Sequence, residues 1–188
     1  MSFLNPRVTT AAAGLVALCA LAVAPIAAQA ADTPVTGTLT AGALSDTAPA
    51  ITAFSTALTG VTQTVNTAVG AWSVTDARGT NAGYSVTVAA SAPTVAGAAG
   101  AAGTGGSLTL TPTTATAAAG NPATVGPVAG SAQLLGTTAA TIQNAIAATG
   151  QGKWDFASGA TSLAVVIPGD ASVGEYSSTL TFTTAPLA

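Results

Sequence analysis

Few side chains in this sequence could carry out chemistry. The 188 residues include six Asp or Glu, three Lys or Arg, one Cys and no His. Without His, neither a Ser-His-Asp nor a Cys-His nucleophile can be assembled, and no imidazole is available to a metal. The carboxylates are scattered, with no pair at catalytic spacing and no D-x-D-x-D-G calcium loop. We therefore expect a noncatalytic protein that uses no metal and no cofactor.

Three features come nearest to a catalytic or ligand site. Asp76 and Arg78 lie in a predicted turn, where they form a local ion pair at most. A glycosidase needs two positioned carboxylates, and spacing alone does not exclude Asp155 and Asp170, although nothing nominates them. The Gly-rich tract 97–106 lacks the Gly-Lys-Ser/Thr of a phosphate-binding loop. A secreted hydrolase is therefore the least favoured hypothesis.

Charge and aromatic content narrow the kinds of partner. The net charge of −3 and the isoelectric point near 4.2 argue against binding the nucleic-acid backbone, which needs clustered Lys and Arg. The two Trp residues could stack on sugar rings if exposed, or fill a core if buried. Trp72 alternates in phase with Val74, which favours the core, whereas Trp154 lies outside a clean alternation and both interpretations stay open for it.

The N-terminus has the pattern of a secretory signal. Arg7 precedes an apolar run over 11–24, Pro25 follows, and Ala28-Gln29-Ala30 has the A-x-A form of a cleavage site. We expect residues 1–30 to be a signal peptide and residues 31–188 to be a single secreted domain with no membrane span. The only Cys lies inside the signal, so disulfides do not hold the domain together. No C-terminal sorting motif is seen, so any attachment to a surface is expected to be noncovalent.

Apolar residues alternate with Thr or Ser along much of the domain. This period of two is typical of antiparallel strands with one buried face, and turn residues such as Asp76, Gly79 and Gly174 separate the runs. Residues 137–149, with Ile142 and Ile146 four apart, are the single candidate helix. We predict an all-β fold, an antiparallel β-sandwich of Ig-like or Greek-key style. The strands are expected at 35–40, 72–75, 84–88, 108–111, 163–167 and 176–183.

Two stretches are low in complexity. Residues 89–106 and 112–131 consist almost entirely of Ala, Gly, Ser, Thr and Pro. Such compositions are typical of long, mobile surface loops or linkers. The alternative is that they pack as irregular loops over one end of the sandwich and shape a binding surface.

Two runs resemble the motifs of WxL-type surface domains. Residues 71–79, which read AWSVTDARG, together with the YSVTV of 84–88, look like the proximal motif. Residues 174–184, followed by Pro186, are similar to the distal motif. The proximal motif has Val74 where the family name has Leu, and the distal motif has neither Trp nor Leu at its Phe182-Thr183-Thr184. The loops and the secretion signal are similar in style to actinobacterial members.

The resemblance implies a secreted β-sandwich that attaches noncovalently to the Gram-positive cell wall, with peptidoglycan or other surface proteins as partners. It implies motif positions, some of which belong to the core, at Trp72, Val74, Asp76, Tyr176 and Phe182. A structural alternative stays open, because low charge leaves strand edges poorly protected against pairing. In that case the chain would be a subunit of an extracellular layer or filament that self-associates through strand edges.

Overall fold

The computed structural model describes residues 35–95 and 106–187. The expected signal peptide, residues 1–30, lies outside the described residues. A compact unit begins at Leu39, and residues 35–38 before it are exposed and have no regular secondary structure. The described part of the unit is all-β, without a helix, as the sequence predicts.

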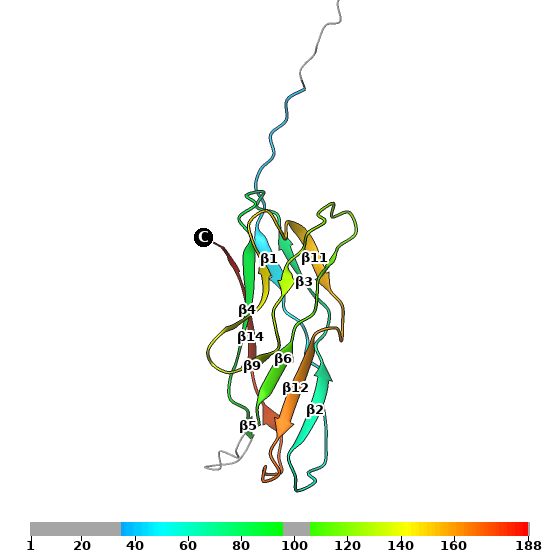
Figure 1. Ribbon diagram of the computed structural model, residues 1–188, viewed down its shortest axis with the longest axis vertical. Coiled ribbons are helices and arrows are strands. Elements are labelled where there is room, and N and C mark those ends of the chain that lie inside the picture. Colours follow the sequence, from blue (N-terminus) through cyan, green and yellow to red (C-terminus); the bar gives the residue numbers. More distant parts are fainter. Residues whose placement is uncertain (1–34, 96–105, 188) are drawn as a thin grey trace, which may run out of the picture. The chain divides into compact units, whose positions relative to one another are not determined.

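Antiparallel strands form three four-stranded sheets (Figure 1). Sheet 1 has the order β1 (Leu44–Thr47), β3 (Trp72–Asp76), β11 (Gly152–Phe156) and β7 (Thr116–Ala117). Sheet 2 has the order β14 (Leu180–Pro186), β4 (Tyr84–Ala90), β10 (Ala140–Ala145) and β8 (Val128–Ala129). Sheet 3 has the order β2 (Gln63–Ala68), β12 (Ser162–Ile167), β6 (Leu108–Thr111) and β9 (Gln133–Leu135). A short pair joins β13 (Tyr176–Ser177) to β5 (Thr94–Val95).

Alternation along the strands produces one core. In β4, Tyr84, Val86 and Val88 are fully buried, while Ser85 and Thr87 between them are half-buried on the outer face. Thr suits the outer face because its branched side chain packs well on a pleated surface. The buried faces of all three sheets meet in a single hydrophobic cluster, as in a β-sandwich. It includes Trp72, Val74 and Phe156 of sheet 1, Val86, Val88 and Ile142 of sheet 2, and Leu108, Leu110, Leu163 and Val165 of sheet 3.

Two predicted elements are wrong. Residues 35–40 are not a strand, because no described strand pairs with them. Val35 and Leu39 are 97% and 100% exposed. Residues 137–149 are not a helix but contain β10, which pairs with β4 and β8. Ile142 is fully buried and Ile146 is 60% exposed, so their four-residue spacing does not mark one face. A bulge between Thr141 and Gln143 obscures the period of two in this strand.

The low-complexity stretches contain regular structure. Within 112–131, β7 pairs with β11 and β8 pairs with β10. The Asn121 side-chain amide donates to the carbonyl oxygens of Gln151 and Lys153, at 3.3 and 2.9 Å. This stretch therefore adds an edge strand to sheet 1 and another to sheet 2 rather than being a plain loop. Within 89–106, β4 ends at Ala90 and β5 pairs with β13, and residues 96–105 lie outside the described part.

Candidate functional site

The aromatic residues of the two motifs, Trp72 and Phe182, meet in the core. Trp72 is only 4% exposed, and its ring stacks on Phe156 with 3.7 Å between ring centroids and 6° between planes. Phe182 of β14 lies against Trp72 at 6.0 Å, tilted by 53°. Sheet 1 and sheet 2 are thus joined through the proximal and distal motifs. Because Trp72 is covered, it packs the sandwich and does not offer a stacking platform to a ligand.

The remaining proximal positions are also interior. Val74 is fully buried, and Asp76, at the end of β3, is 4% exposed. Arg78 binds the Asp76 carboxylate with two donors, Nε to Oδ1 at 2.9 Å and Nη2 to Oδ2 at 2.8 Å, and Nη2 also donates to Gly83 O at 2.7 Å. These hydrogen bonds hold the pKa of Asp76 below its ordinary value, against the opposing effect of burial. The predicted turn and ion pair therefore fix the crossing from β3 in sheet 1 to β4 in sheet 2.

Tyr176 is separated from the proximal motif positions. It lies on β13, opposite Val95 of β5, and its hydroxyl donates to Ser172 O at 2.8 Å. The expected shared face of Tyr176, Leu180 and Phe182 is divided between two sheets, yet all three side chains line one groove. The structure thus brings Trp72 and Phe182 into contact and places Val74 and Asp76 on the same strand face. Tyr176 lies away from the proximal motif, on the groove that Phe182 also lines.

Trp154 is buried by the low-complexity stretch. It is 4% exposed, faces inward opposite Val74, and donates from Nε1 to Gln151 O at 2.9 Å. A Cβ built on Gly126 would lie 2.5 Å from the Trp154 ring, so the Gly126 backbone rests directly on the indole. The question that the sequence left open for Trp154 is therefore answered in favour of the core.

Gly126→Val is expected to lower the free energy of unfolding by about 1–3 kcal/mol, because the added side chain overpacks the Trp154 ring. Trp emission should shift to the red as the indole gains solvent. Gly136→Val is the matched control, since a Cβ there meets no atom within 4 Å. Equal stability of the two variants in urea unfolding would contradict this account of the Gly126 contact.

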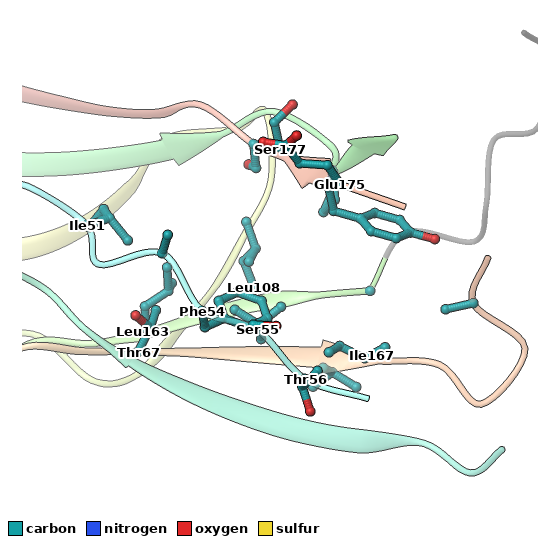
Figure 2. Close-up of a pocket in the computed structure, with 18 of the residues that line it drawn as sticks. Ile51, Phe54, Ser55, Thr56, Thr67, Leu108, Leu163, Ile167, Glu175 and Ser177 are labelled. Carbon is teal, nitrogen blue, oxygen red and sulfur yellow. The ribbon is translucent and has the colours of Figure 1, made fainter. Parts of the chain in front are cut away.

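A long apolar groove opens beside sheet 3 (Figure 2). Its volume is about 1040 Å³. Leu108, Leu163 and Ile167 form an aliphatic floor, and residues 48–58, which we call the strap, run along it (Figure 2). From the strap, Ile51, Phe54 and Leu58 are 37%, 43% and 40% exposed. Glu175, at the opposite wall, is the one Asp, Glu, Lys or Arg among the groove's described residues.

The groove is a poor receptor for a sugar chain. Sugar hydroxyls placed over the aliphatic floor would lose water without gaining hydrogen-bond partners, at a cost of about 1–3 kcal/mol each. Several hydroxyls along its walls are already engaged: Thr67 donates to Thr52 O and Ser178 donates to Ser91 O. The groove therefore suits apolar side chains.

The outer face of sheet 1 has the opposite character. Residues directly opposite in an antiparallel pair share a face, so the register places hydroxyls and charges side by side across this sheet. One row contains Thr47, Ser73, Asp155 and Thr116, and the next contains Ser45, Thr75 and Lys153.

The polar groups of this face are half-buried to exposed, and some are paired within the sheet. Ser73 N donates to Thr47 Oγ1 at 2.9 Å, and Thr116 Oγ1 donates to Asp155 O at 3.2 Å. Lys153 Nζ lies 3.6 Å from Asp155 Oδ1, and the two side chains are 53% and 46% exposed, so this ion pair is weak and its charges cancel. A shallow hollow of about 290 Å³ lies at one end of the sheet, lined by the polar residues Thr47, Ser73 and Asp155 and by Trp72 and Phe156, with Ala71 and Ala157. Ser73 and Thr75 alternate with the buried motif positions and could have been found from that alternation. The strap carries no comparable signal.

Residues 35–95 and 106–187 contain no group of three or more His, Cys, Asp or Glu that could hold a metal ion. Over the same ranges no helix is long and apolar enough to cross a membrane.

The fold is all-β and consistent with a β-sandwich. The model of the WxL family, described as a surface cell wall-binding domain, matches residues 32–186, which include both motifs. The chain belongs to this family, as the motif resemblance predicts. It is thus a surface domain that associates with the cell wall. Neither the curated proteins nor the solved structures give a match.

Proposed function

We propose that the chain is exported, loses residues 1–30 and, as a single noncatalytic domain of residues 31–188, attaches noncovalently to the peptidoglycan of a Gram-positive wall. The observation that carries the proposal is the family match over residues 32–186, with its wall-binding description. The net charge of −3 adds a physical constraint. A domain with so few cations holds its ligand by hydrogen bonds and apolar contacts rather than by pairing with wall anions.

The outer face of sheet 1 is the surface we assign to the wall. It is a neutral, extended array of hydroxyls with one carboxylate and one ammonium group, in which neighbouring strands lie about 4.8 Å apart and successive rows about 6.7 Å apart. Such an array can both donate and accept hydrogen bonds along a glycan strand. In this proposal Trp72, Val74 and Asp76 are positioning residues, because they hold β3 from inside while Ser73 and Thr75 of the same strand face outward.

The test is retention on purified wall sacculi of a Ser45→Val/Thr75→Val variant, which changes two residues that lie opposite each other on β1 and β3. Valine suits a strand and removes the hydroxyl, so the strands should be preserved while the hydrogen-bonding face is lost. We expect the dissociation constant to rise at least about tenfold, the equivalent of ~1.4 kcal/mol.

The matched control makes the same change on sheet 2. Thr87 and Thr183 lie opposite each other on β4 and β14, and the Thr87→Val/Thr183→Val variant should be retained like the wild type. Equal losses in both variants would place the wall contact elsewhere. Retention of the wild type no better than that of an unrelated β-sandwich would refute the wall-binding function itself.

A further inference from the structure

The strap and β2 are the two arms of one hairpin, but only the base of this hairpin has a ladder. Residues 59–62 connect the arms, and Gly60 has a φ of +78°, in the left-handed region that favours Gly. Beyond the base, residues 53–58 have no ladder partner in the described structure. The base is closed by three contacts that advance one residue on each arm: Gly70 N donates to Ala50 O at 2.7 Å, Ile51 bridges Val69, and Thr52 N donates to Ala68 O at 3.3 Å.

The open part of the strap keeps the register of this ladder. Counting along both arms from Ile51 opposite Val69 places Ala57 opposite Gln63, and Gln63 Nε2 donates to Ala57 O at 2.8 Å. Thr59 Oγ1 in turn donates to Gln63 Oε1 at 3.3 Å. The strap is therefore aligned with β2 at both ends, but at the far end a side chain stands in place of backbone hydrogen bonds.

β2 has backbone groups available for a continued ladder. In a strand, the N–H and C=O groups of successive residues point to opposite sides within the plane of the sheet. Val69 N donates to Thr161 O, toward β12, so Thr64 and Asn66 direct their backbone groups toward the strap. Among the described strands β2 pairs with β12 alone, and both of these residues are exposed. Beside residues 53–58, β2 thus has an unpaired edge in the described part of the chain.

One hydrogen bond ends the ladder at Thr52. In a continued antiparallel ladder, Thr52 O would accept from the N–H of Ala68, its hydrogen-bonded partner. In the structure the Thr67 hydroxyl donates to Thr52 O instead. Thr67 is only 7% exposed, so this bond is shielded from water. A local side chain thus takes the place of the next backbone bond.

The groove contacts of the strap also hold it away from β2. Phe54 and Leu58 line the groove, and Phe54 lies near Leu108 of its floor (Figure 2). Ile51 lies opposite the fully buried Val69 and so faces inward, and alternation in a continued ladder would put Phe54 and Leu58 on the outer face. Completing the ladder therefore requires both large side chains to leave the groove.

We propose that residues 53–58 are a lid with two positions. In the position described, Phe54 and Leu58 cover the floor of the groove. In the other, the lid continues the ladder on the edge of β2 and the groove is open. The exchange replaces groove contacts by backbone hydrogen bonds, so the groove is autoinhibited by its own chain until the lid moves. The inference goes beyond wall attachment and does not rest on it, because the outer face of sheet 1 takes no part.

The first test traps the second position with a disulfide. The only Cys of the chain is Cys19, in the expected signal peptide, so two new Cys residues in the secreted domain can pair only with each other. In the continued ladder Ser55 and Val65 lie opposite each other on one face, and Ser55→Cys/Val65→Cys should form a disulfide on mild oxidation of dilute protein. Thr56→Cys/Val65→Cys is the matched control, because its Cys residues lie on opposite faces and should stay reduced. Equal cross-linking of the two variants, or none in the first, would overturn the proposal.

Nile red, a neutral dye that fluoresces in apolar sites, reports whether the groove opens. The oxidised Ser55→Cys/Val65→Cys variant should bind the dye at least about fivefold more tightly than its reduced form, because the floor at Leu108 and Leu163 loses its cover. Equal dye binding would refute the assignment of residues 53–58 as a lid. The oxidised variant should still be retained on sacculi like the wild type, so failure of the lid and failure of wall binding are distinguishable.

Removal of the Thr67 hydroxyl tests what keeps the ladder open. Thr67→Val keeps the branched shape and frees Thr52 O for the backbone. In the Ser55→Cys/Val65→Cys background it should make the disulfide form at least about fivefold faster. Thr64→Val, on the outward face of β2, is the matched control and should leave the rate unchanged. Equal rates in the two variants would contradict the role assigned to Thr67.

Discussion

Trp72→Ala is expected to lower the free energy of unfolding by about 3–5 kcal/mol, because truncation of a buried indole removes apolar contacts and leaves a cavity. The stacked contact with Phe156 and the tilted contact with Phe182 are both lost, so sheets 1 and 2 separate at their motif junction. Urea unfolding followed by far-ultraviolet circular dichroism measures the change. For a domain of this size such a loss is a large part of the whole stability.

Phe54→Ala is the control for this substitution. Phe54 is an aromatic residue on the strap and is 43% exposed, so its truncation should cost much less than that of Trp72. If the two variants unfolded within about 1 kcal/mol of each other, Trp72 would not have the core role assigned to it. A folded Trp72→Phe variant should still bind wall sacculi, since the ring acts through the fold and not on the ligand.

Arg78→Ala is expected to cost about 3–5 kcal/mol at neutral pH, because it leaves the buried Asp76 carboxylate without its guanidinium partner. Lys153→Ala is the matched control: it removes the cation from the exposed pair with Asp155 and should cost less than about 1 kcal/mol. Chemical unfolding at pH 7 compares the two.

The pH dependence of the Arg78→Ala effect has a definite sign. Arg78 lowers the pKa of Asp76 in the folded protein, so the stability from this pair is fully present above the ordinary aspartate pKa. It is lost as the pH falls through the lowered value. Without Arg78 the buried carboxyl protonates more readily, so the difference between the wild type and the variant should shrink below about pH 4. A difference that stayed constant from pH 7 to that range would show that charge is not its origin.

Alternation predicted the interior of the fold well. The runs around Trp72, Tyr84, Leu108 and Leu163 became β3, β4, β6 and β12, because each buries one side chain in two against a facing sheet. Elements that depend on which strand they pair with, rather than on their own alternation, could not be predicted from the sequence. Residues 35–40 have the alternation of a strand, but no described strand pairs with them. In contrast, β10 pairs with β4 although its bulge hides the alternation.

The candidate site was predicted only in part. The motif resemblance gave the family and led to Trp72, Val74 and Asp76, which turned out to be interior. Ser73 and Thr75 lie between these buried residues on β3 and face outward. Their positions can be predicted from the alternation once the buried face is known. The groove depends on the strap, residues 48–58, whose position comes from tertiary contacts such as that of Thr67 with Thr52 O. No local sequence pattern encodes such a contact.

The most direct test of wall attachment is fractionation of the producing cells into medium, wall and membrane, with washes of rising salt and then denaturant. Salt screens attraction between charges but leaves hydrogen bonds and apolar contacts largely intact. We predict that the protein stays with the wall through the salt washes and is released by denaturant. Recovery wholly in the medium, or release by salt alone, would contradict a noncovalent and largely uncharged attachment to the wall.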